Sequence, residues 1–496
     1  GVSIDYVLIS LLREPGRRVF DQYLMVFLLL LHIAMAIWSI VHALLNKRDP
    51  RSALGWIIIS LFFPIVGPFF YWIFGMNRVQ VRAQRLLNKS LTRTTVERRE
   101  DALRRSPDSS RESHHTIRTF LKVSDKVCRL PAIPGNQVDI LFNGDEAYPA
   151  MLQAIEQAQR SVYLMTYIFD TDDTGYTFIE ALDRCQKRGV DVKVLIDGIG
   201  ELGNWRRAST LLARLGVNVQ RFLPMTARPP VFYWNLRNHR KLLVIDDEIA
   251  FTGGINISSR HVLKNNHSKS RVVDMHFRLA GPIVSELRTV FMDDWEFVTG
   301  QPMASPPLEL KPCGTALCRV VVDEPSESTD RLATTLAAAV TAAKQRVVVA
   351  TPYFLPSREL MSALQAAGLR DIDVTVLLPA KNDNRLVHWA TRHLLRNLIQ
   401  FDVKIFYQPA PFVHTKLFII DDQLVFFGSA NMDPRSLRLN FELNVEAYDG
   451  DLVERLMAYI HKQIAASSAM TIQDLEQRTL SQKIRDASAW LFSPYL

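Results

Sequence analysis

The sequence predicts an α/β protein with two tandem domains, each a parallel-rich sheet flanked by helices, after an N-terminal hairpin of two transmembrane helices. Three observations predict this architecture. The start of the chain holds two long uncharged apolar runs, the remainder repeats one order of strands and helices, and one polar motif occurs in both repeats. We expect a membrane anchor at 1–77, a basic and polar linker at 78–135, and two domains at 136–300 and 313–496.

The two apolar runs predict the membrane hairpin. Residues 22–46 and 52–77 contain no charged side chain, and each run is longer than the about 20 apolar residues that a spanning helix needs. Pro64, Gly67 and Pro68 interrupt the second run. We therefore expect the second transmembrane segment to be either kinked or re-entrant, two alternatives that the sequence does not separate.

Positive charge is concentrated directly after the second apolar run. The chain has a net charge of +8, of which residues 78–105 contribute +6, whereas residues 106–496 have no net charge. The positive-inside rule then places both ends of the hairpin and the whole body in the cytoplasm. We expect the basic segment to contact an anionic membrane surface, with a plain topology signal as the alternative. The neutral body predicts no nucleic-acid partner.

Apolar strands that alternate with amphipathic helices predict the two domains. This alternation is typical of sheets with parallel strands covered by helices. A proline-rich segment, 301–316, separates the two halves. The expected strands are 138–142, 161–169 and 190–197 in the first half and 318–322, 346–354 and 372–379 in the second.

The polar motif has the pattern His-x-Lys-x4-Asp-x6-Gly-[Gly/Ser]-x-Asn in both halves. It supplies, in chain order, His239, Lys241, Asp246 and Asn256 from the first copy and His414, Lys416, Asp421 and Asn431 from the second. Strand residues at i and i+2 point to one side, so the histidine and lysine of each copy project together. Chance repetition of five fixed positions is very improbable, and the motif therefore predicts a functional site.

Two imidazoles, two ammonium groups and two amides are the groups that a phosphodiester substrate needs. The lysines neutralise the non-bridging oxygens and the asparagines donate hydrogen bonds to them. One histidine attacks phosphorus and forms a phosphohistidine, while the other protonates the leaving alkoxide. Neither motif has metal-ligand spacing, and the four cysteines suggest neither a zinc site nor a disulfide framework. We predict no metal and no cofactor.

On these paired motifs the sequence resembles the phospholipase D superfamily. The hairpin and the segment RSALGWIIISLFFPIVGPFFYWIFG extend the resemblance to bacterial cardiolipin synthases over almost all of the 496 residues. The resemblance implies a multi-pass enzyme of the bacterial inner membrane, with its catalytic domains in the cytoplasm. It implies transfer of a phosphatidyl group from one phosphatidylglycerol to another, with glycerol as the leaving alcohol. It assigns His239 as nucleophile and His414 as acid and base, an order that the symmetry of the motifs makes reversible.

The resemblance also implies a carboxylate that orients each histidine. The matching positions are Asp274 and Glu442, although Val272 and Val273 precede the first carboxylate where an aromatic residue is expected. Surface acids at a strand edge are the alternative. We include Asp246 and Asp421 in the catalytic set as motif members, but their place at the strand end favours a turn and packing role.

Several alternatives remain open. A hydrolytic phospholipase D uses the same residues with water as acceptor, and a membrane-tethered nuclease or a non-enzymatic membrane scaffold are further readings. The sequence indicates neither the acceptor lipid, phosphatidylglycerol or phosphatidylethanolamine, nor the oligomeric state. Aromatic residues at 232–234 suit a lipid entrance, with a packed loop as the competing account. His388 and His393 fit the face of an amphipathic helix better than a catalytic role.

Overall fold

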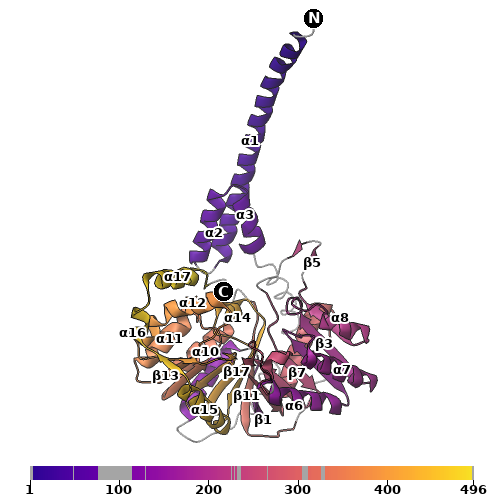
Figure 1. Ribbon diagram of the computed structural model, residues 1–496, viewed down its shortest axis with the longest axis vertical. Coiled ribbons are helices and arrows are strands. Elements are labelled where there is room, and N and C mark those ends of the chain that lie inside the picture. Colours follow the sequence, from indigo (N-terminus) through magenta and orange to yellow (C-terminus); the bar gives the residue numbers. More distant parts are fainter. Residues whose placement is uncertain are drawn as a thin grey trace. The chain divides into compact units, whose positions relative to one another are not determined.

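The computed structural model describes residues 4–47, 50–75, 114–128, 130–224, 226–227, 230–231, 236–264, 266–303, 311–325 and 330–493. The chain divides into two compact units, Gly1–Arg82 and Ala83–Leu496, which are drawn in Figure 1. The basic segment 78–105 and the aromatic residues 232–234 lie outside the described residues. Their predicted roles, and the predicted domain boundaries, stay predictions.

The N-terminal unit begins with one long helix, α1 (Ile4–Asn46). Its stretch Phe20–Asn46 is long and apolar enough to cross a membrane, the only such helix in the described part of the chain. The second apolar run forms α2 (Pro50–Phe62), α3 (Val66–Phe70) and the π-helix η1 (Tyr71–Gly75). A second continuous transmembrane helix is therefore not seen.

The break between α2 and α3 falls at the residues that were expected to interrupt the second run. Residues 63–65 form a bend and turn that includes Pro64. Gly67 allows a close approach, because a Cβ there would lie 2.1 Å from the carbonyl oxygen of Ile59. The Tyr71 hydroxyl lies 2.7 Å from Nδ1 of His42 on α1 and ties the returning segment to the long helix. The described fold of this unit is a helix followed by a broken, returning segment.

One fifteen-stranded sheet forms the frame of the second unit. Its order is β19-β14-β13-β12-β16-β17-β18-β11-β1-β10-β8-β7-β2-β3-β4. The first-half strands are β1 (Ile133–Phe142), β2 (Ser161–Thr166), β3 (Asp191–Asp197), β4 (Asn218–Phe222), β7 (Leu242–Ile245), β8 (Ile249–Gly253) and β10 (Met275–Ala280). The second-half strands are β11 (Ala316–Asp323), β12 (Arg346–Ala350), β13 (Asp373–Pro379), β14 (Lys404–Gln408), β16 (Leu417–Ile420), β17 (Leu424–Gly428), β18 (Glu442–Tyr448) and β19 (Ser468–Met470).

The order of strands confirms the two tandem α/β halves and shows that their sheets are joined. β1 and β11 pair in antiparallel fashion at the centre, and each half continues outward from this pair in the same sequence of equivalent strands. Within this sheet, parallel pairing is confined to β2–β3–β4 and β12–β13–β14. The sheet is therefore mixed, with its parallel portions at the two sides and antiparallel pairing through the middle.

Helices cover both faces of this sheet (Figure 1). Two long helices, α9 (Ile283–Thr299) and α15 (Gly450–Ala465), pack on one face over a core that both halves share. The other face has a separate core in each half. The first half places α6 (Asn143–Gln157), α7 (Asp173–Lys187) and α8 (Ala208–Arg214) there, and the second half places α10 (Arg331–Ala342) and α11 (Arg358–Gly368) there, next to α5 (His114–Val127).

The remaining elements are short or lie at the C-terminal end. They are β5 (Thr226–Ala227), β6 (Pro230–Val231), β9 (Val272–Val273), β15 (Phe412–Val413), the 3-10 helix η2 (Ser259–His261), α12 (Arg385–Leu394), α13 (Arg396–Ile399), α14 (Pro434–Arg438), α16 (Ile472–Glu476) and α17 (Leu480–Leu491). β5 pairs with β6 within the first half, whereas β9 pairs with β15 of the second half. The pairing of β9 with β15 lies directly before Asp274 and His414 in the chain.

A stacked aromatic pair joins the two halves inside the shared core. The rings of Phe277 on β10 and Phe427 on β17 have centroids 3.8 Å apart and are nearly parallel. Both side chains are almost fully buried. Because one ring comes from each half, this contact stabilises the association of the halves as well as each half alone.

We predict that Phe277→Ala destabilises the body by about 3–5 kcal/mol, because it removes a buried ring and leaves a cavity between the halves. The midpoint of thermal unfolding in detergent, followed by intrinsic fluorescence, measures the effect. Leu369→Ala is the control, since this side chain is exposed and its loss should leave the midpoint nearly unchanged. Equal midpoints for both variants would contradict a shared core.

Candidate active site

Each motif histidine lies where the backbone of its own half pairs with the backbone of the other half. His414 follows β15, which pairs with β9 of the first half, and its backbone N–H donates to the carbonyl of Val273 at 2.7 Å. His239 follows a bridge between Asn238 and Phe441 of the second half, and its N–H donates to the carbonyl of Phe441 at 2.9 Å. The same kind of backbone contact between the halves therefore occurs twice, once at each histidine.

Each of these contacts brings a histidine to the carboxylate of the opposite half. Nδ1 of His239 lies 3.1 Å from Oε2 of Glu442, and Nδ1 of His414 lies 2.7 Å from Oδ2 of Asp274. Both carboxylates are fully buried, while the two imidazoles are about one-tenth exposed. With Nδ1–H donating to a carboxylate, Nε2 is left as the atom that can attack or exchange a proton.

The motif lysines lie beside their own histidines. Nζ of Lys241 donates to the backbone carbonyl of His239 at 2.6 Å. Nζ of Lys416 lies 2.8 Å from Nδ1 and 3.1 Å from Nε2 of His414. Lys241 also lies over the ring of Tyr167, with Nζ 5.3 Å from the ring centroid. Each half thus presents one buried ammonium group next to one imidazole.

The charges of the two motifs also act on each other. Burial lowers the pKa of His239 to about 4, and Lys416 of the other half adds to this effect. Burial also lowers the pKa of His414, where Lys416 and, from the other half, Lys241 contribute. Groups from both copies of the motif therefore act on each other, and both histidines are neutral at pH 7.

The buried lysines and carboxylates have shifted pKa values as well. Burial lowers the pKa of Lys241 to about 7 and that of Lys416 to about 8. For the carboxylates, burial alone would raise the pKa, but the neighbouring lysines and the hydrogen bonds from the histidines outweigh it. His239 and Lys241 bring the pKa of Glu442 to about 2, and Lys416 and His414 bring that of Asp274 to about 2. The orienting carboxylates are thus charged at neutral pH.

The motif glycines and asparagines lie at and after the ends of β8 and β17, the second strand that follows each histidine. Gly254 has no room for a side chain, because a Cβ there would lie 2.3 Å from Oδ1 of Asp274. The equivalent Ser429 instead donates from Oγ to Oε2 of Glu442 at 2.5 Å. Both positions therefore support the orienting carboxylate. Asn256 and Asn431 are buried after β8 and β17, and the Asn256 side chain accepts the N–H of Ile168 at 3.2 Å.

Asp246 and Asp421 hold turns, as their place at the strand end suggested, and a catalytic role for them stays a prediction. Both have positive φ angles, of 52° and 50°. Their carboxylates accept backbone N–H groups at the start of a neighbouring strand, from Gln159, Arg160 and Ser161 in one half and from Lys344, Gln345 and Arg346 in the other. This contact fixes the turn that follows the motif strand and involves no motif histidine.

Three further residues beside the histidines were not predicted from the sequence: Tyr167, Tyr353 and His261. Tyr167 lies against His239 with ring centroids 5.0 Å apart, and Tyr353 lies near His414 at 6.4 Å. Each follows the first parallel strand of its half, a placement that could have identified it. His261 is a third buried imidazole near Asp274 and His414, and burial lowers its pKa to about 3. Nothing in its sequence surroundings marked it.

Two other histidines have the packing role that was expected. The ring of His388 lies 5.9 Å from that of Tyr407, and the ring of His393 lies 5.1 Å from that of Trp490. Both belong to α12, whose polar and apolar faces are separated along the helix. Among the residues with described side chains, no group of three or more His, Cys, Asp or Glu is arranged to hold a metal ion.

This arrangement can perform substitution at phosphorus. Two neutral imidazoles offer Nε2 as nucleophile and as proton carrier, two cations face them, and each Nδ1 is fixed by a charged carboxylate. Together with two tandem α/β halves joined in one sheet, the site defines a phospholipase D-like enzyme.

Comparison with known proteins identifies the family. The family model described as cardiolipin synthase, PLD-like domain, matches residues 151–295 and 336–464, and a phospholipase D-nuclease N-terminal model matches 34–75. The chain therefore belongs to the cardiolipin synthase family of phospholipase D-like proteins, which confirms the resemblance seen in the sequence.

Individual relatives agree with this assignment. A cardiolipin synthase of Geobacillus sp. (strain WCH70) is 30% identical over 465 residues, covering 91% of this chain and 90% of the relative. A probable cardiolipin synthase of Bacillus subtilis (strain 168) is 28% identical and covers 94% of this chain and 93% of the relative. A solved phosphatidylserine synthase of Haemophilus influenzae has the same fold, with a TM-score of 0.59 and 15% identity, over 76% of this chain and all of that protein.

We predict that Asp421→Ala destabilises the body by about 1–3 kcal/mol, because three backbone N–H groups, of which that of Arg346 is half-buried, lose a charged acceptor. Asp422→Ala is a matched control, since its carboxylate is half-exposed and pairs only with Arg346, a contact of about 0–1 kcal/mol. Thermal unfolding of both variants in detergent measures the difference. A larger effect from the control would contradict the turn role of Asp421.

Proposed function

We propose that this protein synthesises cardiolipin by transferring a phosphatidyl group from one phosphatidylglycerol to the hydroxyl of a second. The observation that carries the proposal is the pair of histidines, each held at Nδ1 by a carboxylate of the opposite half. Two proton-carrying imidazoles in one site suit a double displacement, in which a covalent intermediate divides one difficult step into two. Relatives named cardiolipin synthase that match nine-tenths of the chain support the lipid substrate.

In the first step, Nε2 of His239 attacks the phosphorus of the donor lipid. A P–N bond forms, the bond from phosphorus to the glycerol oxygen breaks, and His414 gives its proton to that oxygen. Glu442 accepts Nδ1–H of His239 and stabilises the positive charge that grows on the ring. In the second step, the hydroxyl of the acceptor gives its proton to His414 and attacks phosphorus, and the P–N bond breaks.

His414 must carry a proton at Nε2 for the first step, although its pKa is lowered in the free protein. Burial is the main cause, and the charge of Lys416 beside the ring is the second. A bound phosphodiester is an anion and offsets the charge of Lys416. Binding of the donor thus raises the pKa of His414 and prepares it as an acid. Lys241, Lys416 and the amides of Asn256 and Asn431 stabilise the non-bridging oxygens.

The setting of the reaction is part of the same proposal. The apolar stretch of α1 and the broken segment after it anchor the enzyme in a bacterial inner membrane, with the catalytic halves on the cytoplasmic side. The basic segment 78–105 is proposed to lie against anionic headgroups. Phosphatidylglycerol serves as donor and acceptor.

We predict that kcat/KM falls in steps as the pH rises: first as the acid His414 loses its proton, since its pKa in the free protein lies below the ordinary value of 6.5, and again through about 7 to 8. Both lysines must be charged to bind the phosphate, and burial lowers their pKa values to about 7 and about 8. A lysine loses its positive charge above its pKa, so the fall in activity lies on the alkaline side. The neutral nucleophile is retained down to about pH 4. The measurement is kcat/KM against pH, which reports groups of the free enzyme.

Lys241→Arg tests the assignment of this alkaline limb. Arginine stays charged, so the loss near pH 7 should disappear, whereas the falls caused by His414 and, near pH 8, by Lys416 should remain, at a lower maximal rate. Wild-type activity that rises steadily above pH 8 would contradict a role for the charged lysines.

The products of the purified protein test the proposed function directly. We expect cardiolipin and glycerol from phosphatidylglycerol in detergent with a chelator present, measured by mass spectrometry. His239→Ala and His414→Ala should each lower turnover by at least about 1,000-fold, as loss of a nucleophile or acid does in covalent catalysis. Leu369→Ala, an exposed change, serves as the active control.

Other products would redirect the assignment. Phosphatidic acid as the sole product would make the protein a hydrolase, and a product formed only with phosphatidylethanolamine would change the acceptor. Wild-type turnover that survives both histidine substitutions would overturn the proposed mechanism.

A further inference from the structure

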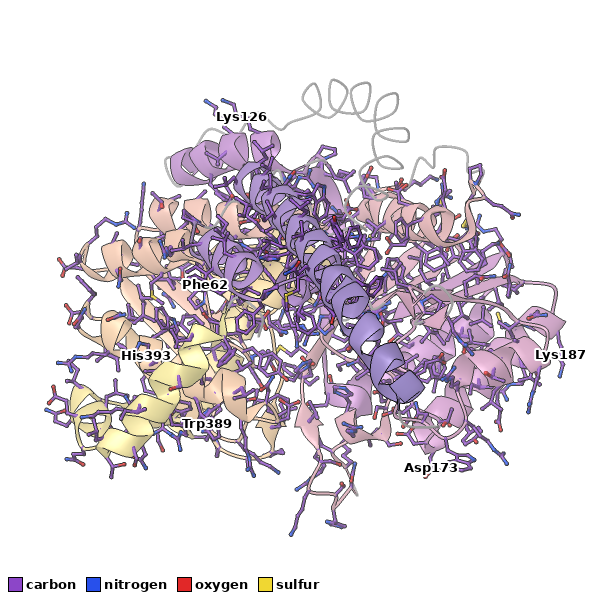
Figure 2. The ribbon with its side chains drawn as sticks, turned by 90° about the horizontal axis from the view of Figure 1, so that it is seen from above. Phe62, Lys126, Asp173, Lys187, Trp389 and His393 are labelled. Atoms are coloured by element: carbon purple, nitrogen blue, oxygen red, sulfur yellow. The ribbon has the colours of Figure 1, made fainter. Side chains whose placement is uncertain are left out.

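An apolar helix face is exposed next to the second half of the site. Helix α17 packs on α12, where Arg485 lies over the ring of Trp389 and Trp490 lies against His393. Figure 2 shows Trp389 and His393 beside the helix α17, drawn in yellow. This packing buries one face of α17 and leaves the opposite face without a described partner.

The uncovered face of α17 is formed by large apolar side chains. Leu480, Ile484 and Leu491 follow one another at intervals of four and seven residues, so they lie on one side of the helix, and Phe492 follows directly. The exposed fractions are 73%, 57%, 69% and 58%. A scattered exposed leucine needs no explanation, but a continuous apolar stripe indicates a surface that something covers.

The first half exposes an apolar loop at the equivalent place. The segment 198–207 follows β3, as α12 follows β13 in the second half. Trp205 in this loop is fully exposed, and Leu202 is half-exposed. The loop is nevertheless anchored, because Asn204 donates to the carbonyl of Phe169 and the carboxylate of Glu201 accepts the N–H of Ser209 at 2.6 Å. The tryptophan is thus held in solvent by an ordered loop.

Both apolar elements lie at the edge of the sheet that carries the site. They follow the carboxyl ends of β3 and β13, and the motif histidines precede β7 and β16, which run antiparallel to β2 and β12. Figure 1 shows α12, α17 and α8 on one side of the body and α15 and α6 on the other.

Direct contacts connect these elements to the histidines. Tyr353, next to His414, donates its hydroxyl to Asp383 at the start of the α12 region at 2.6 Å. In the first half, Gly200 lies so close to the carbonyl of Tyr167 that a Cβ would be 1.7 Å from its oxygen. Tyr167 in turn contacts His239.

The charges around the two apolar elements are mainly positive. Arg206 and Arg207 directly follow Trp205, and Lys381, Arg385 and Lys483 belong to or border the α12–α17 pair, all with exposed side chains. The acidic groups nearby are engaged: Glu201 with Ser209, Asp383 with Tyr353, and Asp486 with Arg478. Exposed tryptophan and leucine side chains with flanking arginine and lysine are the composition that suits the interface of an anionic bilayer.

We propose that the loop 198–207 and the exposed face of α12–α17 form a membrane-contact surface of the catalytic body, which inserts Trp205, Leu491 and their neighbours into an anionic phospholipid bilayer beside the active site. The choice of occupant rests on the proposed function, because a lipid-transferring site must receive its substrate from a bilayer. The two elements, one from each half, hold the site against the membrane surface, independently of the N-terminal helix.

Spin labels on the full-length protein test this surface. Single cysteines replace Trp205 and Leu491 in a Cys313→Ser background, since Cys313 is exposed and the other three cysteines are buried. Leu215→Cys and Leu369→Cys are matched exposed controls. They precede β4 and β13, so they lie at the opposite edge of the sheet. The protein is reconstituted in vesicles of equal parts phosphatidylglycerol and phosphatidylcholine.

Collision with oxygen, which concentrates in lipid, is compared with collision with a water-soluble nickel chelate. We expect the labels at 205 and 491 to meet oxygen several-fold more than the chelate, and the two control labels to show the reverse. All four labels being equally accessible to the chelate would overturn the proposal. The charge-reversed variant Arg206→Glu/Lys483→Glu should return the labels at 205 and 491 toward water. Labels that stay at the same depth in the bilayer would overturn the inferred attraction between these positive charges and the anionic lipids.

The result is separable from the proposed function because label depth is read without turnover. A protein whose labels insert but which makes no cardiolipin contradicts only the proposed function. A protein that makes cardiolipin while all labels remain in water contradicts only this surface.

Discussion

Two buried histidine–carboxylate contacts, His239 with Glu442 and His414 with Asp274, join the halves of this protein. A carboxylate with no exposed surface is costly unless it is paired, so each pair requires the other half to be in place. The backbone contacts at Val273 and Phe441, the shared core with its Phe277–Phe427 stack and the central β1–β11 pairing all serve that requirement. Neither half alone contains a histidine with its carboxylate, which gives a physical reason for the tandem repeat.

Approximate two-fold symmetry does not make the two sides of the site identical. Ser429 donates to Glu442, whereas Gly254 only makes room for Asp274. Lys416 touches both ring nitrogens of its histidine, while Lys241 contacts the backbone carbonyl and the ring of Tyr167. His239 therefore has the better-supported carboxylate and the less direct cationic contact, a difference that supports the proposed order with His239 as nucleophile and His414 as acid.

The sequence predicted what depends on local pattern. The spacing of His414 and Lys416, and its repetition at 239 and 241, was sufficient to locate the candidate site, although these residues lie just before β16 and β7 and not within a strand as expected. The alternation of strands and helices predicted the two halves. It could not show that the carboxylate near His239 in the sequence serves the other histidine, because Asp274 reaches His414 across 140 residues. Antiparallel pairing in the middle of the sheet was also hidden, since apolar strands look alike in either direction. Asp246 shows a further limit of the sequence pattern, because a residue that belongs to the motif can hold a turn.

The most direct test of the crossed pairing is the nitrogen spectrum of histidines labelled with 15N in the membrane-reconstituted protein, with His239 and His414 assigned from His239→Gln and His414→Gln. Crossed pairing predicts that Glu442→Gln shifts the Nδ1 signal of His239 and leaves that of His414 almost unchanged, and that Asp274→Asn does the opposite. If Asp274→Asn moved the signal of His239 and Glu442→Gln moved that of His414, each half would hold its own pair and the two halves would not exchange carboxylates.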